Sequence, residues 1–241
     1  MTQLLSTSKL GKNFGGNRAL NGVDFRADAG EIVGLIGPNG SGKTTFFNCV
    51  TGFLTPSAGR VSWRGADVTG STPGKLAKLG LVRTFQEKMV FPGLSVRENV
   101  RFAIIQHGER DLSEERIRGA LTYVGLTTDI MDHKAGDLPW GQCRLLGIAL
   151  ALVLKPALIL LDEPFAGTNR LAAHQVTQVL FKLKADGIGA IIVEHEMSLL
   201  LPACDRVVAF ASGQVIGEGT PAEIIHNPAV REAYFGADHA A

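Results

Sequence analysis

The chain has 241 residues, which fits one sizeable domain or two lobes that share a chain. Hydrophobic residues make up 45% of it and charged residues 20%, so a buried core can form and intrinsic disorder is excluded. The 24 lysines and arginines balance 23 aspartates and glutamates, so there is no overall basic footprint and we expect no nucleic-acid partner. Three cysteines without metal-ligand spacing fit a reducing compartment without disulfides.

The first 50 residues predict short β-strands, then a buried strand and a helix. A turn at Gly15-Gly16-Asn17 separates the first strands, and the apolar run over residues 31–36 predicts the buried strand. A helical pattern occupies residues 44–50. The first ten residues lack the apolar core of a secretory signal, so we expect no such signal here.

The segment between this strand and this helix has the phosphate-binding pattern Gly37-x-x-x-x-Gly42-Lys43-Thr44. Glycines let successive backbone N–H groups point at phosphate oxygens, and the helix that begins near Lys43 adds its positive end. Lys43 is expected to reach the β and γ phosphates, and the Thr44 hydroxyl to bind Mg²⁺. The candidate nucleotide-binding residues are Gly37, Pro38, Asn39, Gly40, Ser41, Gly42, Lys43, Thr44 and Thr45.

The middle of the chain, from about residue 92 to 154, has a helical pattern. Helices are predicted from Ser95, from Ser113 and from Gly141. Ser113 is a plausible N-cap, with two glutamates in the first turn that follows it. Arg116 stands where a capping box needs Glu or Gln, so we predict only the simple cap.

One apolar run, over residues 145–161, imitates a membrane span. The pair Lys155-Pro156 divides it, whereas a spanning helix needs about 20 uninterrupted apolar residues. We therefore predict a buried helix, a turn and a buried strand, in a chain that is soluble by itself.

Strands and helices alternate in the last third of the chain. Strands are predicted over residues 157–163, 190–195 and 205–210, and a helix over 170–185. Continuous apolar strands between helices indicate a parallel sheet covered on both faces, so the fold class is α/β and the helical middle is an insertion. Asp162 at the end of the most apolar strand is a candidate Mg²⁺ ligand, and Glu163 beside it could polarise an attacking water.

The order of the motifs resembles that of the ATP-binding subunits of ABC transporters, over nearly all of the chain. The matching positions are Phe14, the phosphate-binding loop, Gln86, the segment 138–142, Asp162 with Glu163, the segment 166–169, and His195. Within the family, residues 83–86, 95–100, 194–197 and 227–236 look like those of the ATPases of branched-chain amino acid importers. The resemblance implies ATP hydrolysis that energises import of a small solute, most closely branched-chain or related amino acids.

The resemblance also implies an architecture. It is a P-loop NTPase (RecA-like) core with an N-terminal antiparallel β subdomain and an inserted α-helical subdomain. We expect a single ABC ATPase domain over residues 1–241. Its nucleotide-binding core and β subdomain comprise about 1–86 and 157–241, and its helical signature subdomain comprises about 87–156.

By the same resemblance, ATP and Mg²⁺ are the cofactors, and each further position has a role. Glu163, His195 and Gln86 are the catalytic candidates, with His195 at the γ-phosphate and Gln86 touching both Mg²⁺ and the attacking water. Thr44, Gln86 and Asp162 are the metal candidates. Phe14 is expected to stack on adenine, although an aromatic residue in a short strand is about as often a core residue. Gly141 and Gln142 belong to the segment 138–142, which is called the signature segment below, and are expected to contact nucleotide bound on an opposite subunit.

The implied partners follow from that arrangement. Two ATPase subunits, identical or different, pair head to tail around two ATP molecules. Transmembrane permease subunits hold the pair at the cytoplasmic face of the membrane as peripheral subunits, and a periplasmic or extracellular solute-binding protein acts indirectly. We expect the permease contact near residues 86–97, where Met89-Val90-Phe91 offers apolar anchors. A turn that packs on its own helical lobe is an equally good interpretation of those three residues.

Two positions of the segment 138–142 depart from the family pattern. Pro139 stands where a Ser normally donates to the γ-phosphate, and Trp140 stands where Gly is usual. Our hypothesis is that the chain hydrolyses its own ATP and contributes a weakened signature to its partner's site. The alternatives are an ATPase of another transport system such as lipopolysaccharide export, a nucleotide-binding module with impaired hydrolysis, and a soluble ABC-type ATPase. The last usually needs two cassettes or a coiled-coil insertion, for which 241 residues leave no room.

Overall fold

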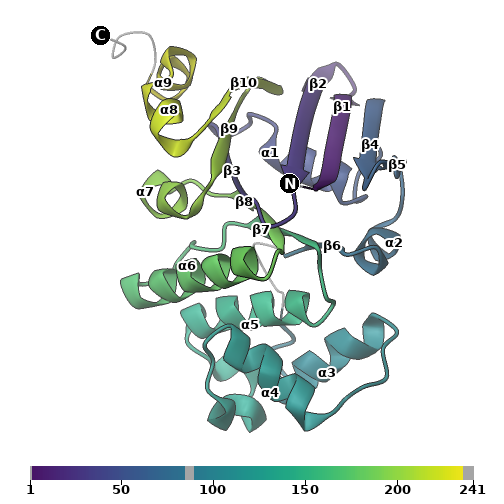
Figure 1. Cartoon of the computed structure of the whole chain (residues 1–241), viewed down its shortest axis with the longest axis vertical. Helices are drawn as coiled ribbons and strands as arrows, with labels where there is room; N and C mark the ends of the chain where they lie inside the picture. Colours follow the sequence, from purple (N-terminus) through teal and green to yellow (C-terminus); the bar gives the residue numbers. More distant parts are fainter. Residues whose placement is uncertain (1, 85–89, 236–241) are drawn as a thin grey trace.

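The computed structural model describes residues 2–84 and 90–235. Two β-sheets lie side by side, and a group of helices lies beyond the edge of the larger sheet (Figure 1). Helices and strands alternate along the larger sheet, and the α/β prediction is confirmed.

The smaller sheet is antiparallel and is built mostly from the N-terminal residues. It contains β1 (Gln3–Phe14), β2 (Asn17–Asp28), β4 (Ala58–Trp63) and β5 (Ala66–Asp67), in the order β2-β1-β4-β5. The turn at Gly15 and Gly16 is confirmed, because Phe14 pairs with Asn17 across it. The prediction of short strands is wrong: β1 and β2 have 12 residues each. Bulges in β1 interrupt the alternation of side chains, and the left-handed Lys9 (φ 46°) lies within that irregular stretch.

The larger sheet is mainly parallel and carries the apolar strands. It contains β3 (Ile32–Ile36), β6 (Leu81–Arg83), β7 (Leu158–Asp162), β8 (Gly189–Val193), β9 (Arg206–Ala211) and β10 (Gln214–Gly219), in the order β10-β9-β3-β8-β7-β6. Only the pairing of β9 with β10 is antiparallel among the described strands of this sheet. Every residue of β3, β7 and β8 is buried, which explains their unbroken apolar sequences.

Helices follow the parallel strands, and three of them form the predicted insertion. Those of the sheet region are α1 (Lys43–Val50), α2 (Pro73–Lys78), α6 (Arg170–Ala185), α7 (Met197–Leu200), α8 (Pro221–His226) and α9 (Pro228–Phe235). Between β6 and β7 the chain forms α3 (Val96–Gln106), α4 (Glu114–Tyr123) and α5 (Trp140–Leu152). Short 3₁₀ helices occupy Thr128–Asp132, Ala135–Asp137 and Leu201–Ala203.

Side-chain caps begin two helices of the insertion. The Ser113 hydroxyl accepts from the Arg116 N–H, so the predicted cap of α4 is confirmed. α3 begins with a full capping box, in which Ser95 accepts from the Glu98 N–H and the Glu98 carboxylate accepts from the Ser95 N–H.

The apolar run over residues 145–161 is confirmed as a helix, a turn and a strand. α5 ends at Leu152, Lys155 takes a left-handed conformation (φ 51°), and β7 begins at Leu158. Among the residues that the structure describes, no helix has both the length and the apolar character to cross a bilayer.

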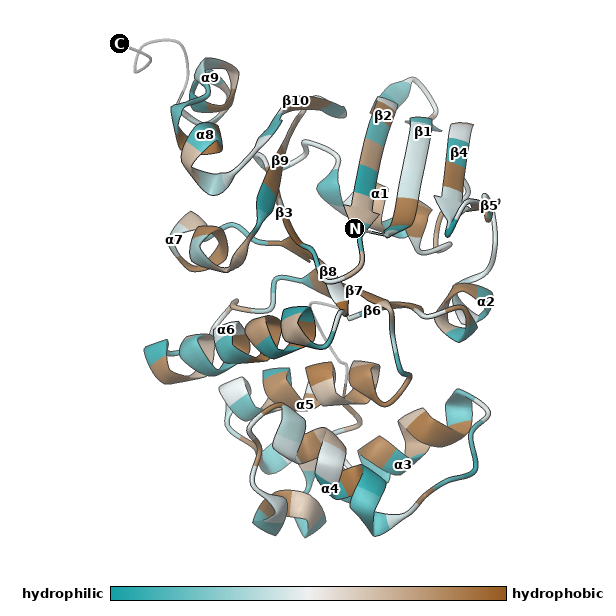
Figure 2. Cartoon of the chain, in the orientation of Figure 1, coloured by the Kyte–Doolittle hydropathy of each residue, from teal (hydrophilic) through white to brown (hydrophobic). Residues whose placement is uncertain are grey.

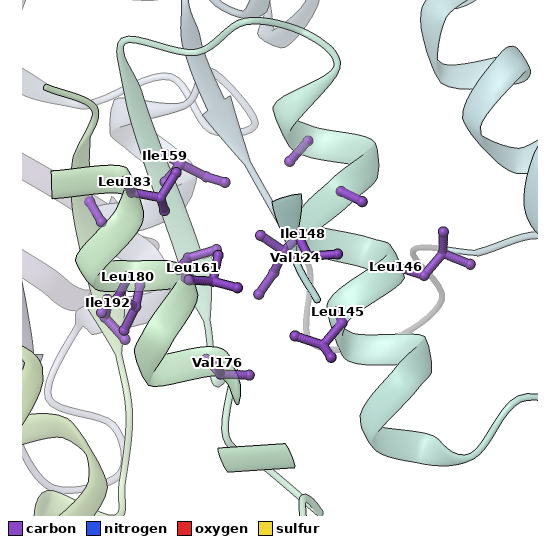
Figure 3. Close-up of a cluster of buried hydrophobic side chains, with 14 of the residues drawn as sticks. Val124, Leu145, Leu146, Ile148, Ile159, Leu161, Val176, Leu180, Leu183 and Ile192 are labelled. Carbon is purple, nitrogen blue, oxygen red and sulfur yellow. The ribbon is translucent and has the colours of Figure 1, made fainter. Parts of the chain in front are cut away.

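The core lies on both sides of the larger sheet. Hydrophobic residues extend along most of α5 (Figure 2). Its Leu145 and Ile148 lie in one cluster with Leu161 of β7 and with Val176 and Leu180 of α6 (Figure 3). This cluster joins the inserted helices to the sheet, so the end of β7 and the start of α5 are held in one packed unit. A second cluster, around α1, lies between the two sheets.

Candidate active site

The glycine-rich loop connects β3 to α1, at the carboxyl end of the parallel strand. Gly37 has φ 150°, and a Cβ there would lie 2.7 Å from the Ser41 Oγ and collide with the Phe210 carbonyl oxygen. Gly42 is the N-cap of α1, with φ 106°, and a Cβ on it would lie 2.7 Å from the Ala19 carbonyl oxygen. These two positions require glycine for both conformation and space. The loop therefore presents backbone N–H groups at the positive end of α1, an arrangement that binds phosphate.

Lys43 turns its ammonium group into this loop. Its Nζ donates to the carbonyl oxygens of Gly37 (2.6 Å) and Pro38 (3.1 Å) and to the Ser41 hydroxyl (3.3 Å). Lys43 is only 5% exposed, and burial lowers the pKa of its ammonium group, an effect that the nearby Glu163 carboxylate opposes. A buried cation surrounded by backbone dipoles fits a polyanionic ligand.

A pocket of about 310 Å³ lies against the loop. It is lined by Phe14, Asn17, Ala19, Asn39, Gly40, Ser41, Gly42, Lys43, Thr44, Thr45, Glu163, Val193 and His195. Phe14 is 48% exposed, and the Lys12 ammonium lies 5.2 Å from the centre of its ring. The core interpretation of Phe14 is therefore wrong, and its ring stands at the rim of the pocket.

Two predicted catalytic side chains meet in this pocket. The His195 Nε2 lies 3.0 Å from the Glu163 Oε1, although the residues belong to the ends of different strands. Glu163 has a left-handed backbone (φ 48°), and its N–H donates to the Val193 carbonyl oxygen at 2.9 Å. Such strained conformations persist only where the surroundings impose them and are concentrated at functional sites.

Glu194 is a supporting residue that the sequence reasoning did not assign. The residue is 4% exposed, and its carboxylate accepts from the N–H groups of Phe165 (3.1 Å) and His195 (3.0 Å). Burial raises the pKa of this carboxyl group, and the backbone hydrogen bonds oppose that effect. Glu194 thus joins the segment after β7 to His195. Its sequence signal is a lone charged residue directly after a fully apolar strand.

Asp162 is not among the described residues that line the pocket, and it has a partner that the sequence did not predict. The Arg83 guanidinium donates to its Oδ2 at 2.7 Å and to the Asn48 Oδ1 at 2.5 Å. The side chains of Arg83 and Asp162 are 5% and 11% exposed. Because an unpaired buried carboxylate is costly, the ion pair with Arg83 stabilises Asp162 at the end of β7.

The residues fit Mg²⁺ as an ion carried with phosphate. Thr44 and Asp162 offer hard oxygen donors at the start of α1 and the end of β7. Within the described ranges, no group of three or more His, Cys, Asp or Glu side chains could hold a metal ion by itself. Mg²⁺ usually takes one or two protein ligands and completes its shell with phosphate oxygens and water.

The signature segment lies apart from this pocket. Pro139 is the N-cap of α5 and gives it no side-chain hydrogen bond. The Trp140 indole N–H donates to the Ala166 carbonyl oxygen at 3.0 Å, and its ring covers Gly167. Gly141 and Gln142 are half-buried in the first turn of α5 and are not among the described residues that line the pocket. Gln86 and Met89 lie outside the described residues.

Known proteins are similar to this chain over almost its whole length. The family model described as ABC transporter matches residues 20–166, and the model of the branched-chain amino acid ATP-binding cassette transporter matches residues 214–240. A probable branched-chain amino acid transport ATP-binding protein LivG of Archaeoglobus fulgidus is 37% identical, over 98% of this chain and 96% of its own. The high-affinity branched-chain amino acid transport ATP-binding protein BraF of Pseudomonas aeruginosa is 34% identical, over 97% and 98%.

Solved structures of ATP-binding cassettes are also similar to this chain. A crystal structure of the ADP conformation of an ATP-binding cassette of an ABC transporter superposes with a TM-score of 0.89 at 35% identity, covering 98% of this chain and 100% of that one. A dimeric structure of a post-hydrolysis state of another ATP-binding cassette, bound to ADP and Pi, gives a TM-score of 0.80 at 26% identity, over 90% and 99%. The predicted nucleotide-binding fold is confirmed, and the chain belongs to the ABC transporter family as an ATP-binding cassette with ATPase function.

Proposed function

We propose that this chain binds ATP with Mg²⁺ and hydrolyses it to energise the import of branched-chain or related amino acids. The observation that carries the ATPase part is that one pocket is lined by residues 39–45 of the phosphate-binding loop, Lys43 among them, and by Glu163 and His195. The names of the relatives and the match of residues 214–240 support the substrate class.

The loop N–H groups and Lys43 hold the phosphates, and the Phe14 ring receives adenine at the rim. Thr44 and Asp162, with Gln86 outside the described residues, would hold Mg²⁺, and the ion would supply positive charge beside the transferred phosphoryl group. Because Lys43 already donates to loop carbonyls, it exchanges those acceptors for phosphate oxygens when ATP binds. This exchange offsets the cost of keeping a buried cation.

Glu163 orients and polarises the attacking water, and His195 contacts the γ-phosphate. The 3.0 Å contact with His195 and the backbone bond to Val193 fix the Glu163 carboxylate at the pocket wall. Removing a positioned general base typically lowers turnover by about 10²–10⁴. Glu163→Gln keeps the shape and the His195 contact, so it isolates the loss of the base.

The test of this role compares Glu163→Gln with Glu115→Gln, an exposed glutamate in the first turn of α4. We expect Glu163→Gln to bind ATP with nearly unchanged affinity and to lose at least about 100-fold in turnover. Glu115→Gln is expected to match the original chain in both measurements. Turnover of Glu163→Gln within threefold of the original would remove Glu163 from the proposed catalytic role.

We also propose a head-to-tail pair of ATPase subunits, identical or different. Gly141 and Gln142 stand outside the pocket of their own chain, as a contact to nucleotide on an opposite subunit requires. Pro139 cannot donate a hydrogen bond there, so the signature is weakened. Pro139→Ser is expected to raise the turnover of the assembled transporter, and unchanged turnover would contradict the weakened signature.

The permease subunits would dock in an apolar groove of about 300 Å³ between α2, α3 and α5. The exposed rings of Phe91 and Phe102 line it and contact each other edge to face, 4.7 Å apart. Apolar grooves with exposed aromatic residues are suited to an amphipathic partner helix. Such docking would place the chain at the cytoplasmic face of the membrane as a peripheral subunit.

Phe91→Glu tests this docking against Ile225→Glu, an equally exposed apolar position on α8. We expect Phe91→Glu to lose co-purification with the permease while ATP binding stays intact, and Ile225→Glu to retain both. Retained co-purification of Phe91→Glu would exclude the groove as the contact.

The transport class is tested by purifying the chain from membranes and identifying the chains that accompany it. We expect permease subunits, a periplasmic or extracellular solute-binding protein and uptake of labelled leucine or isoleucine in reconstituted vesicles. Lys43→Ala should abolish that uptake. Uptake that persists in Lys43→Ala would refute the energising role.

A further inference from the structure

The last described helix, α9, contacts the beginning of the phosphate-binding loop. The Gly37 N–H donates to the Tyr234 hydroxyl oxygen at 2.5 Å, across 197 residues of sequence. Tyr234 lies in α9, within the matched C-terminal segment 214–240, and Gly37 is buried at the end of β3. None of the catalytic roles proposed above uses Tyr234.

Several contacts fix α9 so that this hydroxyl group has a defined position. α8 and α9 lie beside β9 and β10 (Figure 1). The Asn227 Oδ1 accepts from the N–H groups of Ala229 (3.0 Å) and Val230 (3.3 Å), and so caps the start of α9. Val230 is 4% exposed and packs in the core cluster, which also contacts the half-buried Tyr234. α9 is therefore packed against the sheet region, and the Tyr234 hydroxyl group points at the phosphate-binding loop.

Gly37 is the residue through which this contact reaches the phosphate site. Its N–H bonds Tyr234, while its carbonyl oxygen accepts from the Lys43 ammonium at 2.6 Å. Its backbone has φ 150°, a conformation that few residues adopt. A hydrogen bond that fixes Gly37 therefore fixes the orientation of a carbonyl that holds the phosphate-binding lysine.

We propose that Tyr234 is a positioning residue for nucleotide binding, which couples the docking of the C-terminal helix to the shape of the phosphate-binding loop. The loop is preorganised while α9 is docked, so ATP binds without the cost of ordering Gly37. By reciprocity, bound ATP must stabilise the docking of α9 by the same factor. This inference depends on ATP binding by the pocket described above.

The chain offers a matched control, because it has two tyrosines. The Tyr123 hydroxyl donates to the Asp186 Oδ2 at 2.7 Å, and Tyr123 is not among the described residues that line the nucleotide pocket. Tyr234→Phe and Tyr123→Phe each remove one hydroxyl group and keep the ring. We expect Tyr234→Phe to weaken ATP binding about two- to tenfold, the worth of one hydrogen bond, and Tyr123→Phe to leave it unchanged. The KM for ATP should rise in Tyr234→Phe while kcat at saturating ATP stays within twofold.

Hydrogen exchange distinguishes this coupling from a general loss of stability. We expect added ATP to slow amide exchange over residues 228–235 in the original chain, and to slow it less in Tyr234→Phe. Asn227→Ala, which removes the cap of α9 at a distance from the loop, should also weaken ATP binding and provides the test if Tyr234→Phe does not fold. Equal ATP affinity in Tyr234→Phe and the original chain, or exchange in α9 that ATP leaves unchanged, would overturn the inference. Failure of the original chain to bind ATP would instead refute the proposed function.

Discussion

Substitution of Gly141, in the first turn of α5, tests how closely the signature segment packs against α6. A Cβ at Gly141 would lie 2.5 Å from the Ala172 Cβ in the first turn of α6. Both methyl groups are attached directly to helical backbone, so neither can rotate away. Gly141→Ala must therefore push α5 and α6 apart.

The net cost follows from two opposing effects. Overpacking a close contact typically costs about 1–3 kcal/mol, and the rigid attachment of both groups favours the upper half of that range. Replacing Gly by Ala in a helix recovers up to about 1 kcal/mol. We expect Gly141→Ala to lower the free energy of unfolding by about 1–2 kcal/mol.

Equilibrium unfolding in urea measures this change, with Gly119→Ala as control. A Cβ on Gly119, in α4, would meet no atom within 4 Å, so that variant should gain up to about 1 kcal/mol. Ala172→Gly should relieve the contact, so the double variant Gly141→Ala/Ala172→Gly should be more stable than the sum of the single changes predicts. If Gly141→Ala left the free energy of unfolding unchanged, and the effects of the two single changes added up in the double variant, a close contact between positions 141 and 172 would be refuted.

Two further predictions concern charge and thiols. Arg83→Met leaves the Asp162 carboxylate nearly buried without its cation, and we expect a loss of about 3–5 kcal/mol in urea unfolding. Arg97→Met removes ion pairs to exposed carboxylates and should lower the free energy of unfolding far less. Equal losses in the two variants would contradict the different worth of the buried and the exposed ion pairs. Burial raises the pKa of the Cys49 thiol to about 11 and that of Cys204 to about 12, so at pH 8 both should react with iodoacetamide at least tenfold slower than in urea, and faster as the pH rises. Equal native and denatured rates, followed by mass spectrometry, would contradict that burial.

The sequence predicts an element well where its signal is local. The strands β3, β7 and β8 are buried over their whole length, so their apolar runs stand out by themselves. The phosphate-binding loop is equally local, because one loop and one helix start supply its geometry. β1 is longer than the sequence predicts. Its pairing has register shifts after Thr7 and after Leu10, and these shifts break the two-residue alternation by which a continuous strand is recognised in a sequence.

The supporting contacts of the site could not be predicted in the same way. Arg83 meets Asp162 across 79 residues of sequence, and Glu194 accepts from Phe165 across 29. Each pair is created by neighbouring strands of the sheet, and a single sequence carries no signal for which side chains meet there. A buried charged residue after an apolar strand can be found from sequence, but its partner cannot.

These supporting contacts explain where the binding energy of ATP can be used. Gly37 is enclosed by Phe210 of β9 and bonded by α9, and Gly42 is enclosed by Ala19 of β2, so distant parts of the chain fix the loop. A loop that is already ordered does not consume binding energy in ordering itself. A ligand shifts a conformational equilibrium only through its different affinity for the two states. In the head-to-tail pair proposed above, the energy that ATP contributes would therefore be available for closing the pocket against the signature segment of the second subunit. The packing of α5 on β7 and the bond of Trp140 to Ala166 would hold that segment as one surface.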